Sequence, residues 1–393
     1  MQYVIVGGGV AGMTAALDLA SRDVGTIALY TDEAHPYYYR PMLTEFFCGK
    51  VGMARLVRRD LDWYAGRGID VHLETRVTAL HPAAKTIALE DGTEVPYDKL
   101  LLAVGSLPFV PPIAGKEKAG IYTWRTLADT LALQETATAC GKTLVLGGGL
   151  LGLEAARGLS KFCANVTVLE YFPRLLPRQL DTVGAGLLQR FVENLGIEVV
   201  LGAETVAFLG EQHVTGARLK DGREFPAGLV LVAAGVRSDV SLAQAAGLAV
   251  DRGVVVDAHM ATSAPDIYAA GDVAVYQGQS WAIAPIAQAQ ARIAAANMAG
   301  ESQRYDVVVP STTLKVVGIE VSSVGVVNPD GADYVEVAAL DEDAGIHKKI
   351  VLHEGLIVGA IVINAKPLAK QLEQHISERH AMTQDAAQAL VDG

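Results

Sequence analysis

Two stretches of the chain, residues 4–20 and 144–160, share one order of hydrophobic and polar positions. The first reads VIVGGGVAGMTAALDLA and the second reads LVLGGGLLGLEAARGLS. In each, a short apolar run leads into a glycine-rich turn and then into a second, longer apolar segment. This order predicts a buried strand, a tight turn and a helix. A further apolar strand follows each copy, at residues 26–33 and 166–170, and ends in acidic residues.

The segments that follow these two units also match each other. Residues 69–104 and 197–235 read as short strands separated by turns, with Asp91–Gly92 and Asp221–Gly222 as hairpin turns. The chain therefore contains two copies of one plan, a βαβ unit followed by a β-meander. The Pro- and Gly-rich stretch from Ser106 to Gly115 predicts a linker that crosses between them.

The pattern changes in the last third of the chain. A strand that ends at Gly271–Asp272 is followed by a helix with Pro285 near its first turn, where the missing N–H costs nothing. From Tyr305 onward the sequence reads as short β segments, and an amphipathic helix is predicted at about residues 367–379. We therefore expect a third, smaller domain.

Length and composition limit the classes of protein that fit this pattern. The 393 residues are too many for one hydrophobic core, so two or three domains are expected. The net charge of −12 argues against nucleic acid as a partner. No apolar run reaches the ~18 residues of a membrane helix, and no secretory signal precedes the first strand, so we expect a cytoplasmic protein without a membrane span. Arg55, Arg58 and Arg59 form a local basic cluster, for which a solvated helix face is the commoner explanation.

Each glycine of the two G-x-G-x-x-G turns has its own chemical purpose. The first permits the tight turn, the second lets the backbone approach a pyrophosphate, and the third lets the helix pack close to the strand. The turns contain Gly7, Gly9 and Gly12 in the first copy, and Gly147, Gly149 and Gly152 in the second. Carboxylates that follow, Asp32 and Glu33 in the first copy and Glu170 in the second, can accept hydrogen bonds from ribose hydroxyls. Two dinucleotide sites are expected. Glu170 favours NADH over NADPH because a carboxylate repels a 2′-phosphate, and Arg174, which follows soon after, works against that preference.

These motifs together resemble the pyridine nucleotide–disulfide oxidoreductase superfamily, flavoproteins with two dinucleotide-binding domains. The resemblance rests on GGGVAG near the N-terminus, AVGSLP at 103–108, GGGLLGLE at 147–154, AAGVRSD at 233–239 and TSAPDIYAAGD at 262–272. It implies an α/β fold with two Rossmann-like domains, similar to glutathione reductase, and a small α+β C-terminal domain. The implied limits are 1–108 and 240–304 for the FAD domain, 109–239 for the NAD domain and 305–393 for the C-terminal interface domain.

The resemblance implies FAD at the first turn and NADH, in preference to NADPH, at the second. The implied FAD contacts are Gly7, Gly9, Val10, Ala11, Gly12, Asp32, Glu33, Arg40, Pro41, Val77, Ala103, Gly105, Glu154, Asp272, Ile286, Ala287 and Lys315. The implied NAD contacts are Gly147, Gly149, Leu150, Leu151, Gly152, Glu170 and Gly235. In this scheme Arg40 bonds the FAD pyrophosphate, Asp272 bonds the ribityl chain, and the helix that begins near Ile286 faces the pyrimidine end of the flavin.

The cysteines give no sign of thiol chemistry. Cys48, Cys140 and Cys163 form no close pair, so neither a disulfide framework nor a metal site is expected. Relatives with a redox cysteine carry it at a position that corresponds to about Arg40–Pro41 of this chain. Seven residues of helix span roughly 10 Å, so Cys48 is interpreted as a buried small hydrophobic residue.

The stretch PYYYRPMLTE, residues 36–45, resembles the arginine–proline motif of NADH-dependent reductases of rubredoxins and ferredoxins. Glu45 stands where many ferredoxin reductases have a lysine that pairs with a glutamate matching Glu154, so this chain departs from that pair. An acid at Glu45 and the stretch STTLKVVGIEV are closer to NADH:rubredoxin reductases. By that resemblance Lys315 approaches the flavin, and the alternative is a lysine on the surface.

The expected function is transfer of electrons from NADH through FAD to a small one-electron carrier protein. The carrier would be a rubredoxin, a ferredoxin or a rubredoxin domain linked to a flavodiiron protein, and a nitrite reductase module stays open as the acceptor. One alternative is an NADH oxidase, a peroxidase or a coenzyme A disulfide reductase, and another is a non-catalytic redox-sensing flavoprotein. Either a monomer or a homodimer is compatible with the sequence.

Overall fold

The computed structural model describes residues 1–137, 141–163, 165–306, 311–316 and 318–393, with the backbone alone for 311–316. The chain divides into two compact units. Unit one contains residues 1–108 and 236–308, and unit two contains residues 109–235 and 309–393. The three-domain division expected from the sequence remains a prediction. Among the described residues, no helix has both the length and the apolar character needed to cross a membrane.

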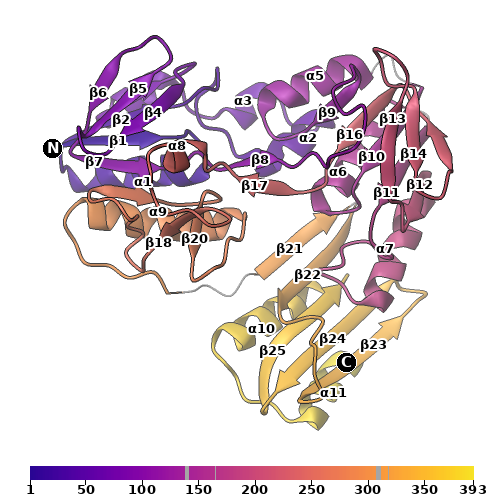
Figure 1. Ribbon diagram of the computed structural model, residues 1–393. Helices are drawn as coiled ribbons and strands as arrows, with labels where there is room; N and C mark the ends of the chain where they lie inside the picture. The colour runs from indigo at the N-terminus through magenta and orange to yellow at the C-terminus, as the bar shows by residue number, and fades with distance from the viewer. Residues whose placement is uncertain (138–140, 164, 307–310, 317) are drawn as a thin grey trace. The chain divides into compact units, whose positions relative to one another are not determined.

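Unit one is built on a five-stranded parallel sheet with the order β19-β7-β1-β2-β3. Its strands are β1 (Gln2–Val6), β2 (Thr26–Tyr30), β3 (Ile69–His72), β7 (Lys99–Leu102) and β19 (Ile267–Ala269). All but the first residue of β1 are buried, as expected for a parallel strand covered on both faces. Helices α1 (Val10–Arg22) and α9 (Ala284–Met298) pack against each other along the sheet (Figure 1).

The remaining elements of unit one are short. Its small sheets contain β4 (Val77–His81), β5 (Thr86–Leu89), β6 (Glu94–Pro96), β8 (Ser106–Pro108), β17 (Val236–Ser238), β18 (Val254–Val256) and β20 (Ala274–Tyr276). Its short helices are η1 (Arg40–Met42), α2 (Leu43–Phe47), α3 (Met53–Leu56), α4 (Leu61–Ala65) and α8 (Ser241–Ala245). The prediction that Ser106 to Gly115 is only a linker was incomplete, because β8 pairs antiparallel with β17, far away in sequence.

Unit two repeats the plan of unit one. Its parallel sheet has the order β12-β11-β10-β16-β9. The strands are β9 (Ile121–Thr123), β10 (Lys142–Leu146), β11 (Asn165–Glu170), β12 (Ile197–Leu201) and β16 (Leu229–Val232), and the meander contains β13 (Thr205–Leu209), β14 (Gly216–Leu219) and β15 (Glu224–Pro226). The helices are α5 (Leu127–Ala137), α6 (Leu150–Leu159) and α7 (Thr182–Asn194). The predicted α/β class and internal repeat are confirmed.

The C-terminal part of unit two is an antiparallel sheet with the order β21-β22-β25-β24-β23 and two helices (Figure 1). The strands are β21 (Ser311–Val316), β22 (Ile319–Gly325), β23 (Tyr334–Asp341), β24 (Ile346–His353) and β25 (Leu356–Ile363). The predicted terminal helix is α10 (Lys366–Ser377). A second helix, α11 (Gln384–Asp392), was missed by the pattern and covers β23 and β24.

A buried polar cluster joins this C-terminal sheet to α7. Asp181 caps α7 by accepting a hydrogen bond from Gly184 N at 2.8 Å, and His347 Nε2 of β24 lies 3.1 Å from both carboxylate oxygens. Lys349 Nζ lies 3.6 Å from the same carboxylate and also pairs with Glu336. Burial would raise the pKa of Asp181, but hydrogen bonds from His347 and Gly184 outweigh it and hold the pKa below its usual range. The ionised carboxylate therefore stabilises both the start of α7 and its contact with β24.

Candidate dinucleotide sites

The first glycine turn depends on hydrogen atoms where other residues have a Cβ. Gly7 has φ +114°, and a Cβ there would overlap the carbonyl oxygen of Ala103 at the end of β7. A Cβ on Gly12 would overlap the carbonyl oxygen of Gly7. The turn is closed from β2 by a hydrogen bond from Gly7 N to Tyr30 O at 2.8 Å. The structure thus brings the predicted residues Gly7, Gly12 and Ala103 into direct contact.

The start of α1 lies beside the guanidinium of Arg40. Gly9 caps the helix without any side-chain hydrogen bond, so the first-turn N–H groups beyond it point outward at Val10 and Ala11. A Cβ built on Gly9 would lie 3.9 Å from the Arg40 guanidinium. A positive helix end and a guanidinium side by side are the features that a pyrophosphate requires. Pro41 lies next to this position in η1 and is exposed.

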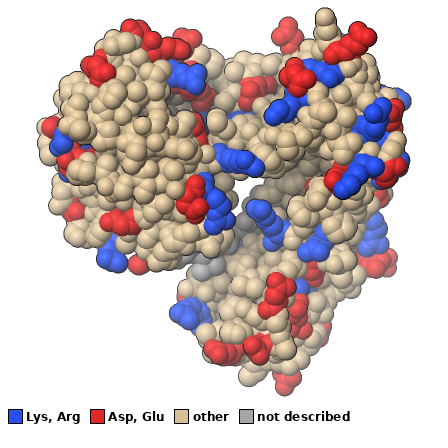
Figure 2. Space-filling view, viewed as in Figure 1, with Lys and Arg blue, Asp and Glu red and all other residues tan. Residues whose placement is uncertain are grey.

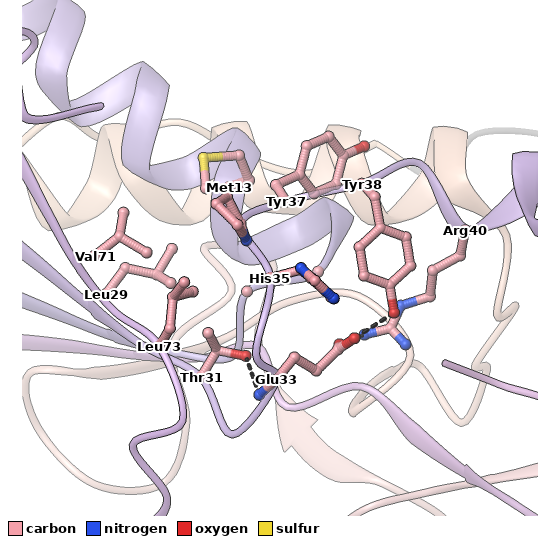
Figure 3. Close-up of a pocket in the computed structure, with 13 residues that line it drawn as sticks. Met13, Leu29, Thr31, Glu33, His35, Tyr37, Tyr38, Arg40, Val71 and Leu73 are labelled. Atoms are coloured by element: carbon pink, nitrogen blue, oxygen red, sulfur yellow. Dashed lines mark hydrogen bonds and ion pairs between the residues drawn. The ribbon is translucent and has the colours of Figure 1, made fainter. Parts of the chain in front are cut away.

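A pocket opens next to this position, and Figure 3 shows its two contrasting sides. Arg40 and the Tyr38 hydroxyl both donate hydrogen bonds to the Glu33 carboxylate on the polar side. The apolar side is formed by Met13, Leu29, Val71 and Leu73, and the rest of the lining comes from Gly8, Gly9, Thr31, His35, Pro36 and Tyr37. Burial raises the pKa of Tyr37 to about 12, so its phenol stays protonated. The pocket therefore offers donors, one carboxylate and an apolar wall to a nucleotide.

The structure separates the two acids that follow β2. Glu33 lines the pocket, whereas Asp32 is exposed and is not part of the lining. Leu29, Thr31 and Glu33 all line the pocket, as the two-residue alternation of an extended chain requires. That alternation was available in the sequence and would have chosen Glu33. The sequence interpretation also passed over His35, Tyr37 and Tyr38 as site residues, although it had singled out the stretch that contains them.

The start of a second helix, α9, lies near the start of α1, with Gly271 between them. A Cβ on Gly271 would lie 2.9 Å from Ala11 Cβ of α1 and 3.5 Å from Ala287 Cβ of α9. The start of α9 carries Pro285 in its first turn, and its N–H groups are not used by a side-chain cap. Helix ends on both sides of Gly271 give unit one two positions that stabilise negative charge. This arrangement fits an extended ligand with phosphates at α1 and a polar ring at α9, which FAD is.

Asp272 lies between these helix ends and is held in place by distant residues. Its Oδ2 accepts a hydrogen bond from Ser106 Oγ at 2.8 Å, and its carbonyl oxygen accepts one from Ser238 Oγ at 2.6 Å. Of the other predicted FAD contacts, Val77, Ala103, Ile286 and Ala287 are buried in the core of the unit. Gly105 has φ +79° and accepts a hydrogen bond from Asp239 N at 3.0 Å.

The second glycine turn has the same geometry in unit two. Gly147 has φ +116° and is closely approached by Ala233 at the end of β16, while a Cβ on Gly152 would overlap the Gly147 carbonyl oxygen. Gly149 caps α6 without a side-chain hydrogen bond and faces open space. Leu150 and Leu151 form the first turn, and the Leu151 side chain is exposed.

The acidic residue that follows the second glycine turn, Glu170, stabilises the turn itself. Glu170 ends β11 and is 5% exposed, and its two oxygens accept hydrogen bonds from Gly148 N and, at 2.7 Å, from Phe172 N. Its carboxylate therefore fixes the turn, and the predicted bond to a ribose remains a prediction. Tyr171 and Phe172 are both exposed and meet edge to face with ring centres 5.4 Å apart, a feature that sequence reasoning missed. Gly235 follows β16 with φ +102° and open space around it.

Three further residues of the sequence interpretation lie outside these geometries. Glu154 is half-buried on α6 of unit two, and the side chain of Lys315 is outside the described residues. Cys48 follows α2 as its C-cap and does not line the first pocket. The prediction that Cys48 is buried was wrong, because α2 ends there and the residue is half-exposed beside exposed Gly49. Cys163 is buried, and Cys140 lies outside the described residues.

Two family models cover most of the chain. The pyridine nucleotide-disulphide oxidoreductase model matches residues 1–291, and the model of the rubredoxin NAD+ reductase C-terminal domain matches residues 310–380. A nitrite reductase [NAD(P)H] of Bacillus subtilis is 37% identical over 92% of this chain and 45% of its own length. The chain thus spans about half the length of that relative or less.

Two other comparisons extend over nearly all of both chains. The ferredoxin–NAD(+) reductase component of the biphenyl dioxygenase system of Paraburkholderia xenovorans is 35% identical, over 92% of this chain and 89% of its own. The crystal structure of NADH:rubredoxin oxidoreductase from Clostridium acetobutylicum superposes with a TM-score of 0.82 at 26% identity, over 98% of both chains. The chain therefore belongs to the pyridine nucleotide-disulphide oxidoreductase family, in the branch of the rubredoxin and ferredoxin reductases.

Proposed function

We propose that this chain carries electrons from NADH through FAD to a small one-electron carrier protein. The observation that carries the proposal is Arg40, which stands in the first pocket beside the start of α1 and bonds Glu33. Thiol-dependent relatives have their redox cysteine at about this position. In this chain the position serves the binding of phosphate, and Cys48 lies beyond η1 and α2.

The residues of unit one would bind and orient FAD. The α1 N-terminus and Arg40 would hold the pyrophosphate, and Glu33 would accept ribose hydroxyls. Asp272, fixed by Ser106, would bond the ribityl chain, and the α9 N-terminus would stabilise negative charge at the pyrimidine end. FAD bound there would supply the hydride acceptor for NADH and the capacity to release electrons one at a time. Positioning supplies most of the catalysis, because hydride transfer needs no acid or base from the protein.

The second turn of unit two would hold NADH. Its open face at Gly149 leaves room for the pyrophosphate at the start of α6. The C-terminal sheet joins this unit through Asp181 and His347, so unit two presents the nicotinamide site and the C-terminal surface as one compact body. The carrier is a rubredoxin, a ferredoxin or a flavodiiron-linked rubredoxin domain. Rubredoxin and ferredoxin are the carriers named for two relatives that this chain resembles along nearly its full length.

Replacing Cys48 by alanine tests whether a thiol takes part. The Cys48→Ala enzyme is expected to reduce rubredoxin or ferredoxin with NADH at a rate within about twofold of the original, since a cysteine without redox duty acts as a small hydrophobic residue. The rate per bound FAD is followed by carrier absorbance under argon. Cys163→Ala is the matched control, because that buried residue has the same substitution inside unit two. If Cys48→Ala lost turnover with every acceptor while Cys163→Ala kept it, the protein would instead belong to the peroxidase and coenzyme A disulfide reductase class.

A further inference from the structure

The stretch from Lys50 to Arg67 is basic in a chain whose net charge is −12. It carries five exposed basic side chains, Lys50, Arg55, Arg58, Arg59 and Arg67, against two acids, Asp60 and Asp62. Among the residues that the structure describes, none of these five basic side chains forms an ion pair, whereas other arginines, such as Arg22, Arg190 and Arg218, each pair with a carboxylate. We call this stretch, residues 50–67, the arginine segment.

Part of the arginine segment is held rigid by a tryptophan. The guanidinium carbon of Arg67 lies 3.6 Å from the centre of the Trp63 ring, and that of Arg59 lies 4.9 Å from it. Arg67 Nη1 also donates a hydrogen bond to Trp63 O at 3.0 Å. Asp60 is occupied as the N-cap of α4, where it accepts a hydrogen bond from Trp63 N. Two like charges are therefore fixed on one ring, which lowers the entropy cost of binding a partner there.

The segment also exposes apolar side chains among its arginines. Met53 of α3 is 37% exposed and Leu61 of α4 is 43% exposed, while Leu56 and Tyr64 of the same helices are buried in the unit. Apolar residues with arginines around them are the usual composition of a protein–protein contact surface. The face drawn in Figure 2 carries both basic and acidic side chains.

The arginine segment belongs to the same unit as the first dinucleotide pocket. It begins ten residues after Arg40, which lines that pocket. Helix α3 packs against α2, and α2 packs against η1, which begins at Arg40. A continuous run of packed elements therefore connects the segment to the pocket.

We propose that the arginine segment is the docking surface for the electron carrier, and that the carrier presents an acidic face with an apolar centre. The inference rests on the proposed function, because a carrier protein must exist for a surface to receive it. Charge complementarity with the arginine segment favours an acidic partner. A second copy of this chain is also acidic overall, but only the carrier must reach unit one to receive electrons. Opposite charges on the two surfaces raise the rate of encounter, and salt screens that attraction.

The test uses the full chain with bound FAD. The double variant Arg59→Glu/Arg67→Glu is compared with Arg292→Glu/Arg304→Glu, which reverses two other exposed charges of unit one and so has the same net charge. Reduction of rubredoxin and of a [2Fe–2S] ferredoxin by NADH is measured at about 50 mM and about 300 mM sodium chloride. The rate of FAD reduction by NADH without carrier is measured in parallel by stopped flow.

In the segment variant the KM for the carrier is expected to rise about tenfold at low salt relative to the control variant, and this difference is expected to shrink at high salt. Equal KM values in the two variants would overturn the docking proposal and leave the proposed function intact. A parallel loss of FAD reduction would place the arginines in the cofactor site instead. A shift from dimer to monomer without a change in KM would assign the surface to a second copy. If the original protein reduced FAD but neither carrier, the proposed function itself would fail.

Discussion

The Gly152→Ala enzyme is expected to keep its FAD and to lose most of its reduction by NADH. The new Cβ would overlap the Gly147 carbonyl oxygen, so either α6 or the turn must shift. Backbone cannot move aside as a flexible side chain can, and overpacking of this kind costs about 1–3 kcal/mol. If this free-energy cost falls on the binding of NADH, the affinity for NADH decreases by about tenfold to a hundredfold. Stopped-flow reduction of FAD over a range of NADH concentrations measures the loss.

Gly186→Ala is the matched control for Gly152→Ala. Both glycines lie in helices of unit two, but a Cβ on Gly186 would meet nothing within 4 Å. Alanine is the better helix former by about 1 kcal/mol, so this control should be at least as stable as the original protein. Normal reduction by NADH in Gly152→Ala would show that the second turn does not hold the nicotinamide dinucleotide.

The equivalent change in unit one, Gly12→Ala, is expected to remove FAD. The Cβ would overlap the Gly7 carbonyl oxygen, and Gly7 is itself closely approached by Ala103 and cannot yield in that direction. The displaced turn carries the N–H groups beside Arg40, so the phosphate position is lost together with the packing. The purified variant should contain less than about a tenth of the FAD of the original protein. This corresponds to a loss of at least about 1.4 kcal/mol in the free energy of FAD binding.

The ratio of FAD absorbance to protein absorbance after purification measures this loss. Since the added Cβ of Gly12→Ala also disturbs the packing of unit one, circular dichroism and titration with added FAD accompany the measurement, and Gly186→Ala is again the reference. A folded Gly12→Ala protein with full FAD content would contradict the assignment of the first turn. Comparing the two alanine variants separates the sites, since the same substitution at equivalent positions should remove a different cofactor in each unit.

The glycine turns could be predicted from the sequence because their constraints are local. An added Cβ on Gly12 or Gly152 would overlap a carbonyl oxygen of the same turn, so five or six residues encode that constraint. The approach of Ala103 to Gly7 and of Ala233 to Gly147 comes from strands far away in sequence. The choice between Asp32 and Glu33 was also available, through the alternation that places Leu29, Thr31 and Glu33 on one side. The pattern of apolar positions was sufficient for the parallel sheets, whose strands are buried on both faces.

Contacts between distant parts of the chain could not be predicted in this way. The hydrogen bond from Ser106 to Asp272 joins residues 166 positions apart, and no local pattern connects them. The hydrogen bond from Gly148 N to the Glu170 carboxylate depends on how the turn folds back over the end of the strand. Helix α11 was missed because it has only nine residues, and the burial of Cys48 was overstated because the end of α2 was not foreseen.

The central claim is that electrons from NADH leave this protein singly, to a protein carrier. The most direct test mixes the FAD-loaded enzyme with limiting NADH and excess oxidised rubredoxin, and in a second series ferredoxin, without oxygen, and counts the reduced carrier spectroscopically. Because NADH gives two electrons and each carrier accepts one, the expected result is two reduced carriers per NADH. Oxidation of NADH only after a peroxide or a disulfide is added, with no carrier reduced, would contradict the claim.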